Sequence, residues 1–134
     1  MNITLNNQRM NLENAIFNRV PPAQANGELN VLLEDRVDNI KVGLGEVEFN
    51  YIRNVKLNPY SLFDITLTFL YKATFDESFS KEKVEEALKK NIEEVVNKTT
   101  MPAVASQIIA NLTSVNGGAP LVVVPVFVKN GVYK

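Results

Sequence analysis

The clearest pattern in the chain is an alternation of apolar and polar residues between positions 47 and 75. Its second half follows strict period two, with apolar side chains at Phe63, Ile65, Leu67, Phe69, Tyr71, Ala73 and Phe75. The first half keeps the same period through Val47, Phe49 and Tyr51, and Arg53 is the one polar residue at an apolar position. Period two is typical of a β-strand with one buried and one solvated face. The pattern therefore predicts an antiparallel hairpin that turns at "NPYS" (58–61) and keeps one face in water.

A weaker alternation covers the N-terminal stretch. Residues 3–20 alternate loosely between apolar and polar side chains, which predicts a long extended strand. The polar run at residues 6–9 interrupts the alternation, so we expect an irregularity there. Pro21 and Pro22 close the strand, because proline cannot donate a ladder hydrogen bond.

A second strand is predicted at "GELNVLL" (27–33). Its apolar side chains share one face of the strand, at Leu29, Val31 and Leu33. The residues that follow are rich in Asp and Asn, and they predict a polar loop. Because Val42 and Val47 have opposite parity, we expect a β-bulge between residues 43 and 46.

At Ser80 the apolar period changes from that of a strand to that of a helix. The helical spacing is carried by Val84, Ala87, Leu88, Ile92, Val95 and Val96. Ser80 is placed to cap the helix N-terminus, and Glu–Lys pairs at i to i+4 spacing favour the helix on its polar side. The pattern predicts one helix over residues 82–98, with one face on the core and one in water.

A second helix is predicted from Pro102, which suits the first helical turn, to Asn116, where Gly117 can end it. Its apolar stripe consists of Val104 or Ala105, Ile108, Leu112 and Val115. The rest of its surface carries no charge, so we expect a second copy of the chain to cover it. The residues predicted for this oligomer interface are Ala103, Ser106, Ala110 and Thr113.

The most unusual stretch is "PLVVVPVFV" (120–128), an apolar run that contains two prolines. Pro125 removes a ladder donor and Pro120 fixes the start, so the stretch is predicted to be an edge strand or an extended crossover. Two interpretations remain open. Its apolar side chains either plug the sheet, or they line a groove that accepts apolar segments of other chains.

The composition excludes several classes of function. The 134 residues contain no cysteine and no histidine, which excludes disulfides, Cys/His zinc sites and histidine-based nucleophilic catalysis. The formal net charge of −1 provides no basic field for nucleic acid. The N-terminus does not resemble a signal peptide, and no apolar run reaches the length of a membrane helix. We therefore expect a cytoplasmic, non-enzymatic protein without cofactor or metal, and with no nucleic-acid partner and no membrane insertion.

Two groups of carboxylates were considered as chemical sites. Glu46 and Glu48 share one strand face, and Glu34, Asp35 and Asp38 fall in the predicted polar loop. Acid–base catalysis needs carboxyl groups in different, partly buried environments, and a hard cation needs several converging oxygen ligands. Neither arrangement is visible in the sequence, so both groups are interpreted as solvated surface charge.

Two motifs in the C-terminal part resemble those of the SecB family of export chaperones. In that family, a helix opened by an aromatic–Pro pair runs into a glycine turn and a Pro-Leu-x-Leu-x-Pro-Val/Ile segment. Met101 and Pro102 are similar to the helix opening, with Met in place of the aromatic residue. The second motif is matched by Pro120, Leu121, Val123, Pro125 and Val126, with Val in place of the second Leu.

The resemblance implies an α+β fold in a single domain over residues 1–134. The implied architecture is a four-stranded antiparallel sheet with two helices packed on one face, followed by an extended apolar C-terminal segment. It also implies a homo-oligomer, dimer or tetramer, that binds unfolded polypeptide clients in an apolar groove and has a link to protein export. The residues predicted to contact clients are Met101, Leu121, Val123, Val126 and Phe127. The alternative is a non-catalytic adaptor of the same fold with one dedicated partner, such as a phage or toxin–antitoxin component.

Overall fold

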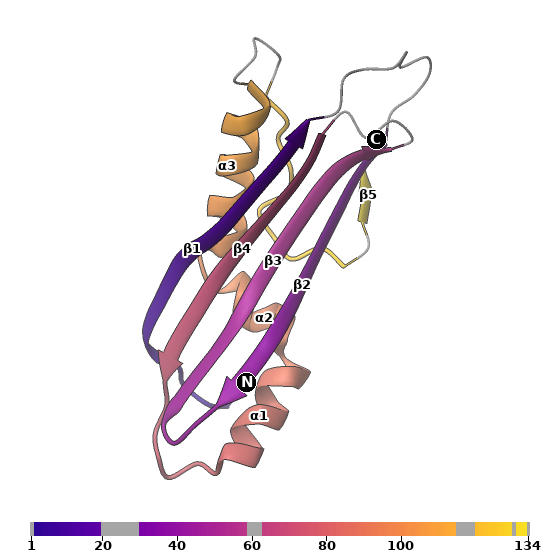
Figure 1. The fold of residues 1–134 in the computed structure, drawn as a ribbon. Coiled ribbons are helices and arrows are strands. Elements are labelled where there is room, and N and C mark those ends of the chain that lie inside the picture. The colour runs from indigo at the N-terminus through magenta and orange to yellow at the C-terminus, as the bar shows by residue number, and fades with distance from the viewer. Residues whose placement is uncertain (1, 20–29, 59–62, 115–119, 130, 134) are drawn as a thin grey trace.

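The computed structural model describes residues 2–19, 30–58, 63–114, 120–129 and 131–133. One antiparallel sheet contains four long strands, which are β1 (Asn6–Arg19), β2 (Asn30–Val42), β3 (Glu46–Asn58) and β4 (Phe63–Thr74). The short strand β5 (Gly131–Tyr133) pairs with the outer edge of β2. The strand order is therefore β1-β4-β3-β2-β5 (Figure 1).

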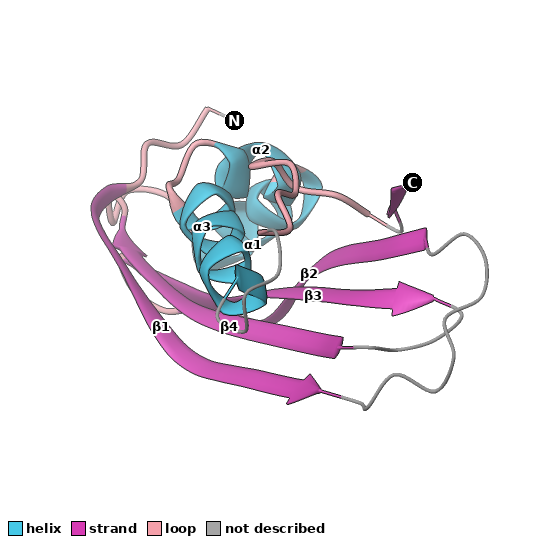
Figure 2. Cartoon of the chain, turned by 90° about the horizontal axis from the view of Figure 1, so that it is seen from above, coloured by secondary structure: helices cyan, strands magenta, loops and turns pink. Residues whose placement is uncertain are grey.

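Helices cover one face of this sheet. They are α1 (Lys81–Lys90), α2 (Ile92–Asn97) and α3 (Met101–Ser114). All three lie on the same side, and no described element covers the opposite side (Figure 2). The predicted α+β class and antiparallel sheet are confirmed, with three helices instead of the two expected.

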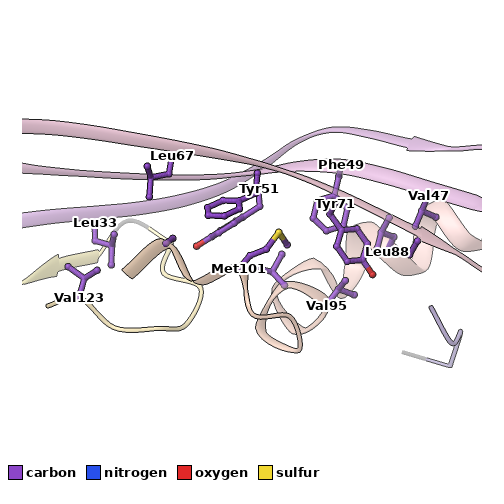
Figure 3. Close-up of a cluster of buried hydrophobic side chains, with 14 of the residues drawn as sticks. Leu33, Val47, Phe49, Tyr51, Leu67, Tyr71, Leu88, Val95, Met101 and Val123 are labelled. Carbon is purple, nitrogen blue, oxygen red and sulfur yellow. The ribbon is translucent and has the colours of Figure 1, made fainter. Parts of the chain in front are cut away.

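The β3–β4 hairpin forms the centre of the core, as its period-two pattern predicts. The side chains that are fully buried on its helix-facing side include Phe49, Tyr51, Val55, Ile65, Leu67 and Tyr71. Figure 3 shows side chains of this face pointing toward Met101 and Val95 from the helices. The rings of Phe49 and Tyr71 stack across the two strands with centroids 4.5 Å apart. Aromatic pairs of this kind add to the stabilisation that burial provides.

Strand β1 contains the irregularity that its polar run predicts. Its register against β4 shifts between Asn6 and Arg9 and again between Leu12 and Asn14. Asn7 has a positive φ of 51°, a conformation that asparagine tolerates better than most residues. The predicted proline break at 21 and 22 lies outside the described residues.

Two predictions for the region of strand β2 are wrong. The residues after Leu33 do not form a polar loop, because β2 continues to pair with β3 as far as Val42. The predicted bulge also lies elsewhere: the register shifts between Asp38 and Lys41, where Asn39 has a φ of 56°. Residues 43–45 form a tight turn, in which the Gly43 amide donates to the Glu46 carbonyl at 2.8 Å. The shift at Asn39 is what restores Val42 to the core-facing parity of Val47, its partner on β3.

The predicted single helix over residues 82–98 is two helices. Ser80 caps α1 as expected, with its side chain accepting a hydrogen bond from the Lys83 amide. The break falls at Asn91, whose backbone amide and side-chain amide both donate to the Ala87 carbonyl. A side chain that competes for a backbone carbonyl in this way favours a helix end over continuation.

Helix α3 begins one residue before the predicted start. Its fully buried side chains are Met101, Pro102, Ala105 and Ile109. The predicted stripe is partly shifted, since Val104 is 42% exposed and Ile108 and Leu112 are half-buried. The predicted helix end at Asn116 and the stop at Gly117 lie outside the described residues.

Candidate functional site

Residues 120–129, which we call the strap, run in an extended conformation across the helix side of the sheet. The strap follows α3 and leads to β5, and in Figure 1 it is the yellow trace behind the sheet. Residues 120–129 contain no ladder strand, so the extended crossover is the alternative that the structure adopts. What holds the strap in place is therefore not a sheet ladder.

A buried ion pair lies beneath the strap. Arg53 on β3 and Asp35 on β2 are cross-strand partners in the register of the sheet. The Arg53 guanidinium binds the Asp35 carboxylate through two hydrogen bonds, Nε to Oδ1 and Nη2 to Oδ2, both 2.8 Å long. Arg53 is 0% exposed and Asp35 is 3% exposed. The Tyr51 hydroxyl donates a third hydrogen bond to the same carboxylate, at 3.0 Å.

The ion pair holds the strap through its main chain. Nη1 of Arg53 donates to the carbonyl of Val124 at 2.8 Å, and Nη2 donates to the carbonyl of Val126 at 2.6 Å. The Asp35 carboxylate accepts from the Val128 amide at 2.8 Å, while the Asp35 amide donates to the Val128 carbonyl at 2.7 Å. We call this set of contacts the clamp. Every strap atom that the clamp binds is a backbone atom.

The clamp also reaches helix α3. Nη1 of Arg53 donates to the Ser106 hydroxyl at 2.7 Å and to the Pro102 carbonyl at 3.3 Å. The Ser106 hydroxyl in turn donates to the Val124 carbonyl at 3.1 Å. One guanidinium thus ties together β2, β3, α3 and the strap, and charge-assisted hydrogen bonds of this kind are among the strongest in proteins.

The environment of the clamp favours a charged guanidinium and a neutral phenol. Burial alone would lower the pKa of Arg53, but the hydrogen bonds and the charge of Asp35 outweigh it, so the pKa is raised. Burial raises the pKa of Tyr51 well above its ordinary value, against the opposing effect of the Arg53 charge. Tyr51 therefore stays protonated as a donor to Asp35 over the whole physiological range.

Two further side chains fix the ends of the strap. Thr113 on α3 accepts a hydrogen bond from the Leu121 amide at 2.8 Å. Asn97, the last residue of α2, accepts from the Phe127 amide at 2.7 Å. The strap is thereby anchored at five of its residues without a ladder pair. A segment interrupted by prolines cannot form a continuous ladder, so these contacts take its place.

The residues predicted to contact clients lie on or next to the strap but differ in exposure. Met101 and Val123 are core residues, 1% and 4% exposed. Leu121 and Phe127 are half-buried, and the Phe127 ring lies 6.2 Å from the Tyr51 ring. Val126 is 48% exposed. Both interpretations of the stretch thus have residues that suit them, since some of its side chains plug the core and others face outward.

The most exposed apolar residue of the strap is one that the sequence did not single out. Val122 is 80% exposed, although it lies between the half-buried Leu121 and the buried Val123. A shallow hollow of about 240 Å³ lies beside Phe127, between β2 and the helices α1 and α2. The apolar residues that line it are Val37, Ile40, Ile92 and Phe127. Lys89, Glu93 and Lys129 lie at its polar rim.

The residues predicted for an oligomer interface are divided between two roles. Ala103 is exposed and Ala110 is half-buried on α3. Ser106 and Thr113 already bind the strap, so their hydroxyls serve the interior of this chain. The uncharged surface of α3 includes Val104, which is 42% exposed.

Neither a metal-type cluster nor a membrane-spanning helix is found among the described residues. No three carboxylate side chains among the described residues come together in a way that would hold a metal ion. No helix within the described ranges has the length and apolar character needed to cross a bilayer. The carboxylates at 34, 35 and 38 lie on a strand and not in a loop, and Asp35 is buried and paired, which corrects its interpretation as solvated charge.

A search of solved structures places this fold beside a known chaperone. The SecB-like chaperone Rv1957 of Mycobacterium tuberculosis, in complex with a ChAD peptide from the Rv1956 HigA1 antitoxin, superposes with a TM-score of 0.60. The match covers 91% of this chain and 89% of that one, at 13% sequence identity. This chain has a SecB-like fold. No protein-family model and no curated protein matches the sequence.

The SecB-like fold explains the order of the strands and helices, but the clamp was missed by sequence reasoning. Arg53 was identified only as a polar residue at an apolar position, and Asp35 was assigned to a loop. The sequence does contain a signal for the ion pair. Asp35 falls on the same face of its strand as the apolar Val31, Leu33 and Val37, and Arg53 falls on the apolar face of the next strand, so two opposite charges occupy core-facing positions. Buried charges need partners, so complementary charges at such positions predict a pair.

Proposed function

We propose that this protein is a SecB-like chaperone that binds extended apolar segments of unfolded or partly folded polypeptides, without catalysing a reaction. The observation that carries the proposal is the strap, an apolar segment fixed through its backbone while the side chains of Val122 and Val126 face outward. A rigid apolar surface loses little conformational entropy when a ligand binds, which favours affinity. The fold similarity to a chaperone that was solved with a bound peptide supports the same function.

The proposed docking surface consists of the outer side of the strap and the hollow beside Phe127. Val122 and Val126 supply exposed apolar area, and Val37, Ile40 and Ile92 line the adjoining hollow. Single exposed valines are ordinary on protein surfaces, but Val122 and Val126 belong, with the half-buried Leu121 and Phe127, to one apolar strip along the strap. Of the residues expected from the sequence, Leu121, Val126 and Phe127 have the exposure that a direct contact with a client needs. Met101 and Val123 are buried, so we assign them a packing role.

The test is the suppression of aggregation of a reduced, unfolded substrate protein, followed by light scattering. Val122→Asp places a charge on the exposed strip, so we expect it to lose most of the suppression. Leu44→Asp is the matched control, because Leu44 is also 80% exposed but lies in the β2–β3 turn away from the strap. If Val122→Asp and Leu44→Asp both suppress aggregation as well as the wild type, the strap is not the docking surface. If the wild type fails to suppress aggregation at equimolar ratio, the chaperone proposal itself is wrong.

A second candidate is an adaptor with one dedicated partner. It is favoured by the same structural neighbour, which was solved with a peptide from a single antitoxin. The two candidates differ in breadth. A chaperone binds several unrelated unfolded proteins with similar affinity, whereas an adaptor retains one protein from its own host and ignores unfolded test proteins.

Self-association through α3 is part of the proposal. Ala103 and Ala110 remain available on the uncharged face of the helix, next to Val104. We expect a dimer or tetramer in light scattering at two concentrations, and Ala103→Asp should lower the measured mass while circular dichroism stays unchanged. An unchanged mass for this variant would exclude α3 as the interface.

A further inference from the structure

The sheet face opposite the helices carries a row of charges that neither the fold nor the proposed function uses. Arg9 on β1 lies opposite Lys72 on β4, Lys72 lies opposite Glu48 on β3, and Glu48 lies opposite Lys41 on β2. These four residues, which we call the basic rung, cross the four long strands in a single line. They flank a hollow of about 410 Å³ near the β2–β3 turn. The rung points away from the core, because Val47 and Ala73 beside it are buried on the helix side.

The charges of the basic rung do not balance. Three cations share one carboxylate, and both of its contacts are long: Lys41 Nζ lies 3.8 Å and Lys72 Nζ lies 3.9 Å from the Glu48 oxygens. Among the described residues, no carboxylate forms an ion pair with Arg9. Arg9 and Lys72 also face each other directly, and like charges at opposite positions of two strands destabilise the pair. The basic rung therefore carries a net positive charge, with three cations against one carboxylate, and Glu46 is the other carboxylate that lines its hollow.

We propose that the basic rung binds an acidic segment of a polypeptide partner in an extended conformation. Neighbouring strands are about 4.8 Å apart, so Arg9 and Lys41, three strand spacings apart, are separated by about 14 Å. Residues i and i+4 of an extended peptide are about 13 Å apart, at about 3.3 Å per residue. A peptide that runs across the strands with carboxylates at i and i+4 reaches both ends of the rung. Lys72 lies one strand spacing from Arg9 and contacts the first carboxylate as well.

The two glutamates in the hollow favour a peptide over a nucleic acid. Glu48 is part of the rung, and Glu46 lines the same hollow. Each strand of a nucleic-acid duplex carries a charge about every 3.4 Å along the helix axis, which would place phosphates next to these carboxylates. A peptide with acidic residues only at alternate positions can place neutral side chains there. The chain as a whole also has a net charge of −1, which does not attract a polyanion over long distances.

Binding is measured by fluorescence anisotropy with a labelled eight-residue peptide of alternating Thr and Glu, in low salt. The same peptide with Gln in place of Glu is the ligand control. We expect Lys72→Gln and Lys41→Gln each to weaken binding by about two- to fivefold, the range of an exposed ion pair. Lys56→Gln is the matched protein control, since Lys56 lies on the same strand and face as Glu48 but in a distant rung opposite Asp64. Binding should also weaken as salt is raised.

The outcomes of this binding experiment either support or overturn the proposal. Binding of the Glu peptide alone, weakened by Lys72→Gln and not by Lys56→Gln, supports the proposal. No binding of the Glu peptide, or binding that is insensitive to both rung variants, overturns it. An oligothymidylate of eight nucleotides that binds the rung more tightly than the Glu peptide overturns the choice of partner. The rung and the strap lie on opposite faces, so Val122→Asp should leave peptide binding at the rung unchanged, and the two proposals fail independently.

Discussion

Replacement of Arg53 by Met is the sharpest test of the clamp. The substitution keeps much of the aliphatic stem and removes a guanidinium that forms six hydrogen bonds. The Asp35 carboxylate would stay buried without its cation, and removing one partner of a buried pair costs about 3–5 kcal/mol. The carbonyls of Val124 and Val126 would also lose a donor, which adds about 1 kcal/mol for each that water cannot reach. We therefore expect Arg53→Met to lower the free energy of unfolding by about 4–6 kcal/mol, a large share of the roughly 5–15 kcal/mol typical of a domain.

The assay is urea denaturation followed by circular dichroism, with Arg36→Met as the matched control. Arg36 lies on the neighbouring strand and forms an exposed pair with Asp38, so its loss should cost less than about 1 kcal/mol. Native-state hydrogen exchange measures the effect locally at Val128. Its amide donates a hydrogen bond to Asp35 in the wild type, and release of the strap should expose that amide and speed its exchange. Equal stability of the two variants, with unchanged protection at Val128, would refute the clamp.

A double variant separates the ion pair from the anchoring of the strap. Replacing a buried ion pair by apolar residues is often neutral, so Arg53→Met with Asp35→Leu would recover full stability if the pair acted alone. In the clamp both partners also satisfy backbone groups of the strap. The double variant should therefore remain less stable than the wild type, and complete recovery would contradict the anchoring role.

Three further predictions concern single residues elsewhere in the fold. The Tyr71 hydroxyl is buried without a hydrogen-bond partner among the described residues, so Tyr71→Phe should stabilise the protein by about 1 kcal/mol in urea denaturation. Burial also raises the pKa of Tyr71 from 10.0 to about 12, so the free energy of unfolding should not depend on this group below pH 10 and should fall as pH rises from 10 through about 12. Tyr71→Phe should flatten that decline, and an identical alkaline profile would contradict it. Ser80→Ala removes the cap on Lys83 and should cost about 1 kcal/mol, whereas no loss would show that the cap is dispensable. Gly45→Ala should lower the melting temperature, because Gly45 has a φ of 71° and an added Cβ would lie 3.0 Å from the Glu77 side chain.

The sequence predicted the parts of the fold whose signal is local. Strict alternation along residues 63–75 identifies β4, and Ser80 marks the start of α1, because each signal is contained within a few neighbouring residues. The course of β2 was not predicted, since its second half carries Glu34, Asp35 and Asp38, a composition typical of loops. Its outward positions tolerate charge, and the one inward charge is neutralised by a residue 18 positions away.

The sequence indicated which segment forms the candidate site, but it did not indicate the contacts that hold that segment in place. The proline-rich apolar stretch was identified from its composition, and proline limits on ladder pairing left two alternatives, an edge strand or an extended crossover, of which the structure has the second. The exposure of each side chain could not be predicted, because it depends on how the strap is rotated about its own axis. Contacts from Arg53, Asn97 and Thr113, on three different elements, fix that rotation.

The backbone anchoring of the strap has a consequence for how this protein can change. A guanidinium and a carboxylate bind the same carbonyl and amide groups whatever side chains those residues carry. The amino acids at 122 and 126 can therefore be exchanged without loosening the segment that bears them. The frame that holds the strap is thus separate from the side chains that the strap exposes, and those side chains can be replaced at little cost to folding.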